Sequence, residues 1–164
     1  MTLTRRSLLI GATCALASPA TAFTITRRNV DRVQVRKAER KLDLIGAGRV
    51  LKSYDIQLGR NPEGRKRFQG DHRTPEGGYR IDRRNEQSLF HLSLGVSYPA
   101  PADRAYAAAR GRSPGGDIFI HGQPNGRPGT IKSDWTRGCI AVSNRDMEEL
   151  WKLVEVDCPI WIYA

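Results

Sequence analysis

Cysteine is scarce in this sequence of 164 residues, which holds only Cys14, Cys139 and Cys158. Three cysteines cannot build a small disulfide-stapled scaffold. Neither a CxxC nor an HxxxH pair is present, so the ligand spacing that is typical of zinc sites is missing and we expect no metal. A disulfide between Cys139 and Cys158 stays open, because sequence alone does not place two thiols together.

Long hydrophobic runs are also absent. The most apolar segment, SLLIGATCALAS, is too short to span a bilayer. Arg5 and Arg6 precede it and the small residues ATA follow it, which together predict an export signal peptide over residues 1–22. The context TRRSLLIG favours twin-arginine export, with a Sec signal as the alternative. The mature chain, residues 23–164, would then lie in the periplasm or cell envelope, with no transmembrane segment.

Acidic residues are few, with 17 Asp and Glu against 27 Lys and Arg. Loss of Arg5 and Arg6 with the signal peptide would leave 25 basic residues and a net charge of +8. Such a chain suits an anionic partner, and for an exported protein that is the cell wall or a membrane surface. The basic residues are scattered and lack the interleaved aromatics of single-strand binders, so we expect no nucleic-acid partner.

Apolar periodicity predicts one mainly β domain with one or two helices. The segment from 101 to 110 is alanine-rich and predicts a short helix. A second helix should follow Ser143 as N-cap, with Met147, Leu150, Trp151 and Val154 on one apolar stripe. The expected strands cover residues 30–38, 40–59 (a hairpin that turns at GAG, with Val50, Lys52, Tyr54, Ile56 and Leu58 on one face), 79–82, 88–95, 116–122 and 158–164.

The segment FQGDHRTPEGGY, residues 68–79, is rich in Gly, Pro and Asp and predicts a loop or turns. Asp71 and Thr74 are expected to fix it through hydrogen bonds to the backbone. His72 is expected to face solvent, and His91 to be a packed or surface residue.

His121 and Cys139 are the candidate catalytic pair. His121 ends the strand-like DIFIHG, and Cys139 follows Arg-Gly in DWTRGCIAVSN. A thiolate is a strong nucleophile, and an imidazole can serve first as its base and then as an acid. Gly138 allows the backbone to approach a substrate carbonyl, where amides near Cys139 would hold an oxyanion. From spacing alone, two structural residues are the more frequent explanation of such a pair.

Three ordered stretches carry a family resemblance: GDHRTPEGGYRI, FHLSLGVSYP, and IFIHG followed by SDWTRGCIAVSN. Together they resemble the YkuD-type L,D-transpeptidase catalytic domain, closest to its YafK-like branch. The likeness covers roughly residues 30–163, nearly all of the predicted mature chain. It implies a β-sandwich-like domain with a cleft over the catalytic cysteine.

The resemblance also implies roles for individual residues. Cys139 would be the nucleophile, His121 the general base, and the carbonyl of Gly122 would orient the imidazole. Amides of Gly138 and Cys139 would form the oxyanion hole, and no cofactor is implied. The substrate-binding residues would be Arg137, Trp135, Thr136 and Tyr79.

Two departures from the family pattern leave the reaction open. Arg137 stands where most members have a second histidine, and Ala141 where many have Arg or Asn. One alternative is a transpeptidase that crosslinks stem peptides or attaches a lipoprotein, with a role in cell-wall biogenesis and cell shape. Another is a hydrolase that releases an outer-membrane lipoprotein from peptidoglycan, as one member of the branch does. The third is a non-catalytic, basic wall-binding module.

Overall fold

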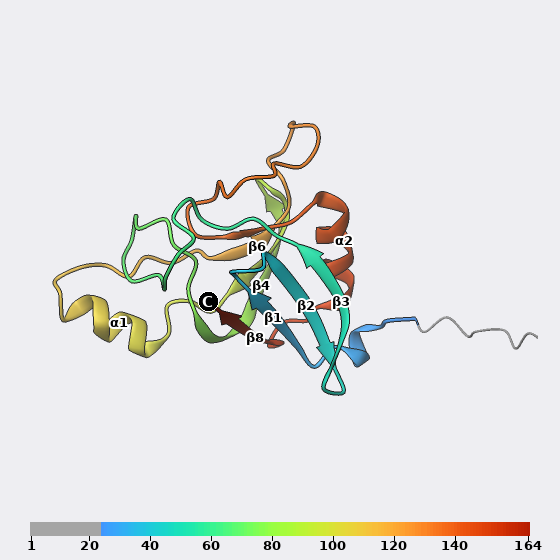
Figure 1. Ribbon diagram of the computed structural model, residues 1–164, viewed down its shortest axis with the longest axis horizontal. Helices are drawn as coiled ribbons and strands as arrows, with labels where there is room; N and C mark the ends of the chain where they lie inside the picture. Colours follow the sequence, from blue (N-terminus) through green and yellow to red (C-terminus); the bar gives the residue numbers. More distant parts are fainter. Residues whose placement is uncertain (1–23) are drawn as a thin grey trace, which may run out of the picture.

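The computed structural model describes residues 24–164 and shows one eight-stranded sheet with a helix at either side (Figure 1). The prediction of a mainly β fold is confirmed. The strand order is β3-β2-β1-β8-β4-β5-β6-β7. The elements are η1 (Arg27–Asn29), β1 (Arg32–Arg36), β2 (Lys41–Gly46), β3 (Arg49–Asp55), β4 (Gly77–Ser88), β5 (His91–Val96), α1 (Pro101–Ala108), β6 (Phe119–His121), β7 (Ile140–Ala141), α2 (Asn144–Leu153) and β8 (Pro159–Tyr163).

Strand β4 pairs with two different neighbours along its length. Its first residues, 77–80, pair with β8, and its later residues pair with β5. The pairs β1–β8 and β6–β7 are parallel, and the other strand pairs are antiparallel. The last strand of the chain therefore lies in the middle of the sheet, between β1 and β4.

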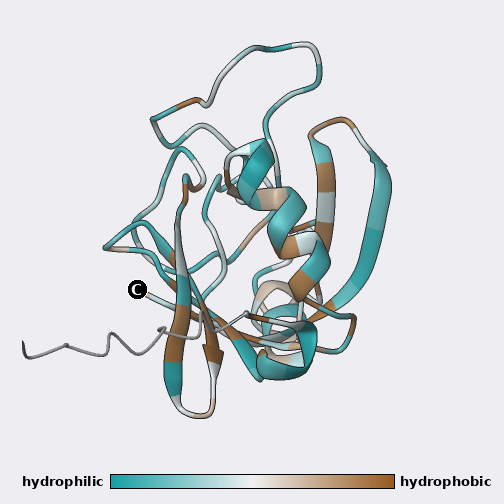
Figure 2. Cartoon of the chain, turned by 90° about the vertical axis from the view of Figure 1, so that its right-hand side faces the viewer, coloured by the Kyte–Doolittle hydropathy of each residue, from teal (hydrophilic) through white to brown (hydrophobic). Residues whose placement is uncertain are grey.

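The hydrophobic core lies between the strands and helix α2. Figure 2 shows apolar and polar residues alternating along the strands, as expected where one face of a sheet is buried. Val33 and Val35 of β1 and Ile160 of β8 are fully buried. Each such side chain contributes about 1.5–3 kcal/mol relative to an exposed one.

Helix α2 begins where the sequence predicts it. The hydroxyl of Ser143 accepts a hydrogen bond from the amide of Asp146 at 3.1 Å, which satisfies one free N–H of the first turn. Met147 and Leu150 are fully buried, while Trp151 is half-buried and carries the guanidinium of Arg84 3.8 Å from its ring. The predicted apolar stripe is therefore confirmed as core packing.

The strands differ from the prediction in one boundary and in the orientation of one side chain. Instead of separate strands over residues 79–82 and 88–95, β4 runs through to Ser88, and only Leu89 and Phe90 separate it from β5. Its polar second half shows no period-two apolar pattern, so the sequence gives no signal for it. Val50 is 54% exposed, because a bulge between Leu44 and Ile45 shifts the register and turns it off the expected face.

The chain that follows β3 crosses to the opposite edge of the sheet. The amide of Gln57 donates to the carbonyl of Ala141 at 2.9 Å, and the amide of Ala141 donates back at 2.8 Å. Gly59 forms a second bridge, with Thr136. These contacts join the two ends of the strand order and fix the segment that carries Cys139.

No helix of residues 24–164 is long and apolar enough to cross a membrane. The predicted signal peptide, residues 1–22, lies outside the described residues.

Candidate active site

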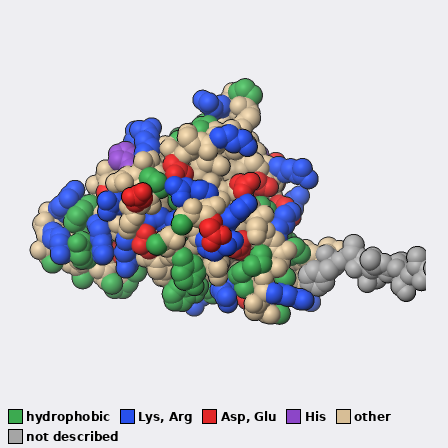
Figure 3. Space-filling view, in the orientation of Figure 1, with side chains coloured by type: hydrophobic (Ala, Val, Ile, Leu, Met, Phe, Trp, Pro, Cys, Tyr) green, Lys and Arg blue, Asp and Glu red, His purple; other side chains and the backbone are tan. Residues whose placement is uncertain are grey.

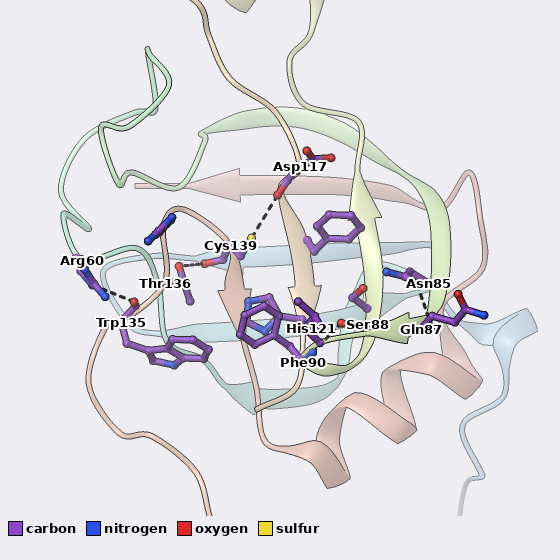
Figure 4. A pocket seen from close by; sticks show the side chains of 14 residues that line it. Arg60, Asn85, Gln87, Ser88, Phe90, Asp117, His121, Trp135, Thr136 and Cys139 are labelled. Atoms are coloured by element: carbon purple, nitrogen blue, oxygen red, sulfur yellow. Dashed lines mark hydrogen bonds between the residues drawn. The ribbon is translucent and has the colours of Figure 1, made fainter. Parts of the chain in front are cut away.

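His121 and Cys139 line the same cavity of about 580 Å³, as Figure 4 shows. His121 is the last residue of β6, and Cys139 directly precedes β7. The two strands pair in parallel, with Ile120 opposite Ile140. Parallel pairing thus places the two residues on neighbouring strands, with Cys139 just before the start of β7 and His121 at the end of β6, opposite Ala141.

A tight turn presents Cys139 to the cavity. The hydroxyl of Thr136 donates to the carbonyl of Cys139 at 2.7 Å and accepts from the amide of Gly138 at 3.1 Å. Gly138 has a φ of 127°, and a Cβ there would lie 2.6 Å from the carbonyl oxygen of Arg73. Only glycine fits this position without displacing the backbone.

Asp134 anchors the same turn to the body of the sheet. Its Oδ1 accepts from the amide of Leu58 at 2.7 Å, and its Oδ2 lies 2.8 Å from Nη2 of Arg40. The carbonyl of Leu58 in turn accepts from the amides of Trp135 and Thr136, each at 3.1 Å. Sequence reasoning missed Asp134, whose only signal is its place five residues before the cysteine.

The imidazole of His121 is buried and fixed in orientation. Its Nδ1 lies 2.7 Å from the carbonyl oxygen of Gly122. A carbonyl can only accept, so Nδ1 carries the proton and Nε2 keeps its lone pair. Burial lowers the pKa of His121, and the Gly122 carbonyl partly opposes this by favouring the charged ring. His121 is therefore a neutral base at pH 7.

Gly122 is a required glycine as well. A Cβ at this position would lie 2.5 Å from Oδ1 of Asn144 and 2.8 Å from Cβ of His91. The amide of Gly122 donates to the carbonyl of Phe90 at 3.0 Å. The residue thus lets the chain pass closely behind His121 while its carbonyl orients the ring.

Two aromatic rings pack around the imidazole. The ring centroid of Phe90 lies 4.7 Å from that of His121, and the centroid of Trp135 lies 5.6 Å away at an interplanar angle of 70°. All three rings lie together on one side of Cys139 in Figure 4. They give this wall of the cavity an apolar surface that excludes water from the base. Phe90 is a second residue that sequence reasoning missed.

The sulfur of Cys139 is not paired with the imidazole in this structure. Its thiol donates to the carbonyl of Asp117, with Sγ and O 3.4 Å apart (Figure 4). Burial raises the pKa of the Cys139 thiol, the amide of Phe119 lowers it, the charge of Asp117 raises it and that of Lys66 lowers it. The net direction is upward, so the pKa of Cys139 favours the neutral thiol in the resting state.

The predicted substrate-binding residues divide into two groups. Trp135, Thr136 and Arg137 line the cavity, and Arg137 is exposed. The hydroxyl of Thr136 forms its hydrogen bonds within the turn, to Cys139 and Gly138, so this residue shapes the loop. The prediction that Tyr79 lines the cleft is wrong: it is buried, and its hydroxyl lies 3.1 Å from Oδ2 of Asp103. Burial and then Asp103 raise the pKa of Tyr79 to about 12.

A second cavity, of about 460 Å³, adjoins the first. Asp117 and Arg137 line both, and Lys66 and His72 add polar groups to the second. His72 was expected to face solvent, but its Nδ1 is buried and has no hydrogen-bond partner among residues 24–164. Asp71 holds this loop as predicted, accepting from the amides of Arg67 and Phe68 at 2.7 and 2.9 Å.

Cys139 and Cys158 are both free thiols, so the disulfide left open by the sequence is absent. Within the described part of the chain, no three His, Cys, Asp or Glu side chains gather closely enough to hold a metal ion.

Comparison with known proteins identifies several relatives of this chain. YafK of Escherichia coli K12 is 29% identical over 128 residues, which cover 74% of this chain and 46% of YafK. Among solved structures, the helical cell shape determining protein Pgp2 of Campylobacter jejuni superposes with a TM-score of 0.64 at 25% identity, covering 81% of this chain and 47% of Pgp2. Bd1075 of Bdellovibrio bacteriovorus superposes with a TM-score of 0.58 at 26% identity, covering 84% and 49%.

The chain thus spans about half the length of these relatives. L,D-transpeptidase 1 of Mycobacterium tuberculosis, with a TM-score of 0.51 at 13% identity over 80% of this chain and 60% of that one, shares the fold. The model of the YkuD family, described as the L,D-transpeptidase catalytic domain, matches residues 30–162, and the chain therefore belongs to this family.

Proposed function

We propose that this chain is a cysteine acyltransferase of the bacterial cell wall, which acts on the stem peptides of peptidoglycan as an L,D-transpeptidase. One observation carries the proposal. A neutral, buried His121 with a fixed tautomer lies one strand from Cys139, and both line one cavity. This is the arrangement that a nucleophile and its base require.

The first half of the reaction forms a thioester. The Cys139 side chain turns from the Asp117 carbonyl into the cavity, and its proton passes to Nε2 of His121. The sulfur attacks the carbonyl carbon of the diamino acid at position three of the stem. As the C–N bond breaks, His121 returns the proton to the leaving amine of the D-amino acid or lipoprotein.

The hydrogen-bond donors that we assign to the oxyanion differ from those that the family resemblance implies. The amide of Gly138 is engaged with the Thr136 hydroxyl, whereas the amide of Cys139 has no hydrogen-bond partner among residues 24–164. The Cys139 amide is therefore the donor that we assign to the developing oxyanion. Thiol, imidazole and amide suffice for this chemistry, and no cofactor or metal enters the proposal.

The second half of the reaction transfers the acyl group to an acceptor. An amine gives a crosslink or an attached lipoprotein, and the thiol is regenerated. Water gives hydrolysis, which is the second candidate function. The second cavity favours this candidate, because Lys66, His72 and Arg137 make its lining polar beside Cys139.

The cellular setting is part of the proposal. The predicted signal peptide would deliver residues 23–164 to the periplasm, where the stem peptides are. The relative from Campylobacter is described as determining helical cell shape. A role in wall structure and cell shape is the corresponding proposal for this chain.

The test uses purified protein and isolated peptidoglycan, with products identified by mass spectrometry. Cys139→Ala should abolish processing, while the matched variant Cys158→Ala, which changes the other free thiol, should retain it. New crosslinks identify a transferase, and free lipoprotein tails or lost D-amino acids without crosslinks identify a hydrolase. Unchanged processing by Cys139→Ala would refute the catalytic assignment, and wall binding without any turnover would favour the binding module.

A further inference from the structure

We propose that a basic and aromatic surface beside helix α1 binds the carboxylates of a peptidoglycan strand outside the catalytic cleft. We call it the α1 patch, and it consists of Arg67, Phe68, Tyr106, Arg110 and Arg112. The choice of peptidoglycan as partner rests on the proposed function. The patch itself rests on contacts and charges that are independent of catalysis.

Stacking fixes the arginines of the patch. The guanidinium carbons of Arg67 and Arg110 lie 4.2 and 3.6 Å from the ring centroid of Tyr106. The guanidinium of Arg112 lies 3.8 Å from the ring of Phe68, whose centroid is 5.9 Å from that of Tyr106. Nη1 of Arg110 also donates to the carbonyl of Tyr106 at 3.1 Å, which fixes this guanidinium further. A stacked guanidinium leaves N–H groups along its edge, and such an edge can bind a carboxylate in a two-point contact.

The positive charge of the patch has no internal partner. Neighbouring cations are neutralised, since Arg65 lies 2.8 Å from Asp103 and Lys66 lies 2.8 Å from Asp71. Four arginines of this end form no ion pair within residues 24–164: Arg67, Arg104, Arg110 and Arg112. Figure 3 shows basic and hydrophobic side chains gathered at the α1 end of the molecule. Like charges held this closely favour an anionic ligand.

The chain neighbours of Arg67 and Phe68 connect the patch to the second cavity. The amide of Gln69 donates to the carbonyl of Ser113 at 2.8 Å, which ties the loop of Arg67 and Phe68 to the segment that follows α1. Lys66 and Gln69 line the second cavity, which shares Asp117 with the cavity of Cys139. A polymer that leaves the catalytic cleft through the second cavity would therefore reach the patch. Peptidoglycan repeats its carboxylate-bearing stems along each strand and is such a polymer.

A lipid surface fits the patch less well. Membrane-bound surfaces usually combine basic residues with large exposed apolar side chains that enter the lipid. The large exposed apolar residues of the described chain lie outside the patch: Val50, Leu89, Val156, Trp161 and Tyr163. The patch offers stacked guanidinium edges, which suit a hydrophilic polyanion.

The first experiment measures co-sedimentation with purified sacculi, using full-length protein with Cys139→Ala so that nothing is turned over. Arg110→Glu with Arg112→Glu should weaken sacculus binding about tenfold, because two charge-assisted contacts become repulsive. The matched control, Arg28→Glu with Arg49→Glu, makes the same charge change at exposed sites outside the patch and should bind within about twofold of the parent. An equal loss of sacculus binding in both variants would overturn the proposal, because binding would then depend on the net charge of the protein and not on the α1 patch.

The second experiment keeps the charge constant. Tyr106→Leu removes the ring that holds two guanidinium groups and should lower sacculus affinity several-fold, whereas Tyr106→Phe keeps the ring and should bind normally. Thermal unfolding of both variants verifies that each is folded. Normal binding by folded Tyr106→Leu would overturn the proposal that stacked arginines form the binding site of the α1 patch.

Two further measurements separate this proposal from the proposed function. With Cys139 intact, Arg110→Glu with Arg112→Glu should process a soluble monomeric muropeptide at the parent rate. Absence of turnover in the parent would refute the proposed function and leave the binding result standing.

Co-sedimentation with vesicles of phosphatidylglycerol and phosphatidylcholine tests whether the patch binds lipid instead. Patch-dependent binding to vesicles, without patch-dependent binding to sacculi, would overturn the proposal.

Discussion

At the scale of single residues, the site is held in a neutral resting state. His121 is buried and its pKa is lowered, and the Cys139 thiol is half-buried and its pKa is raised, with desolvation as the largest cause of each shift. Both shifts oppose a preformed thiolate–imidazolium pair. We therefore expect the proton to pass from sulfur to Nε2 only once substrate is bound. The oxyanion donor and the exclusion of water then change the relative energies of the neutral and charged pairs.

This resting state predicts the pH dependence of alkylation. The rate at which iodoacetamide labels Cys139 should be low at pH 7 and rise with a midpoint above the ordinary thiol pKa of 9.0, because burial favours the neutral thiol. Peptide mapping by mass spectrometry separates this site from Cys158, whose pKa burial raises to about 11. A labelling rate that is already maximal at neutral pH would show a preformed ion pair instead.

Residue identity explains part of what the sequence could predict. The types of His121, Gly122, Gly138 and Cys139 indicate their chemistry, so motif and resemblance could single them out; His121 and Cys139 line one cavity, and the Gly122 carbonyl contacts the imidazole. Tyr79 has no such signature. Its position depends on Asp103, a residue 24 positions away, and the local pattern cannot report a partner at that separation.

At the scale of elements, the catalytic turn depends on strands that the sequence predicts unevenly. Helix α2 and the β2–β3 hairpin follow from cap, turn and periodicity. Strand β7 has only two residues and therefore no period to detect. It exists because Gln57 and β6 both pair with it, and such long-range pairing is set by the tertiary fold.

The hydrogen bond from the amide of Leu58 to Asp134, which anchors the catalytic turn, can be tested by mutation. Asp134→Ala leaves the buried amide of Leu58 without its acceptor, so we expect a loss of about 1–3 kcal/mol in the free energy of unfolding by urea. Turnover of muropeptides should fall as well, since the turn that presents Cys139 is then less firmly held.

A second carboxylate provides the control for this variant. Asp55 lies 2.6 Å from Lys41, but its side chain is 80% exposed, so Asp55→Ala should cost less than about 1 kcal/mol and leave turnover intact. If the two variants were equally stable and equally active, Asp134 would not anchor the catalytic turn.

At the scale of the whole molecule, the chain order makes folding cooperative. Strand β8 is the last element in sequence, yet it lies between β1 and β4 and joins the two halves of the sheet. The half with β1–β3 sends residues 57–60 to the catalytic turn, while the half with β5–β7 carries His121 and Cys139. The active site is therefore complete only when both halves are in place.

We accordingly predict one unfolding transition, with coincident midpoints by circular dichroism and tryptophan fluorescence. Ile160→Ala removes a fully buried side chain from β8 and should destabilise the whole domain by about 2–5 kcal/mol while keeping that single transition. Tyr163→Ala changes the same strand at a residue that is 48% exposed and should cost less. Separate transitions for the two halves in Ile160→Ala would contradict this account, because β8 could not then be the element that couples them.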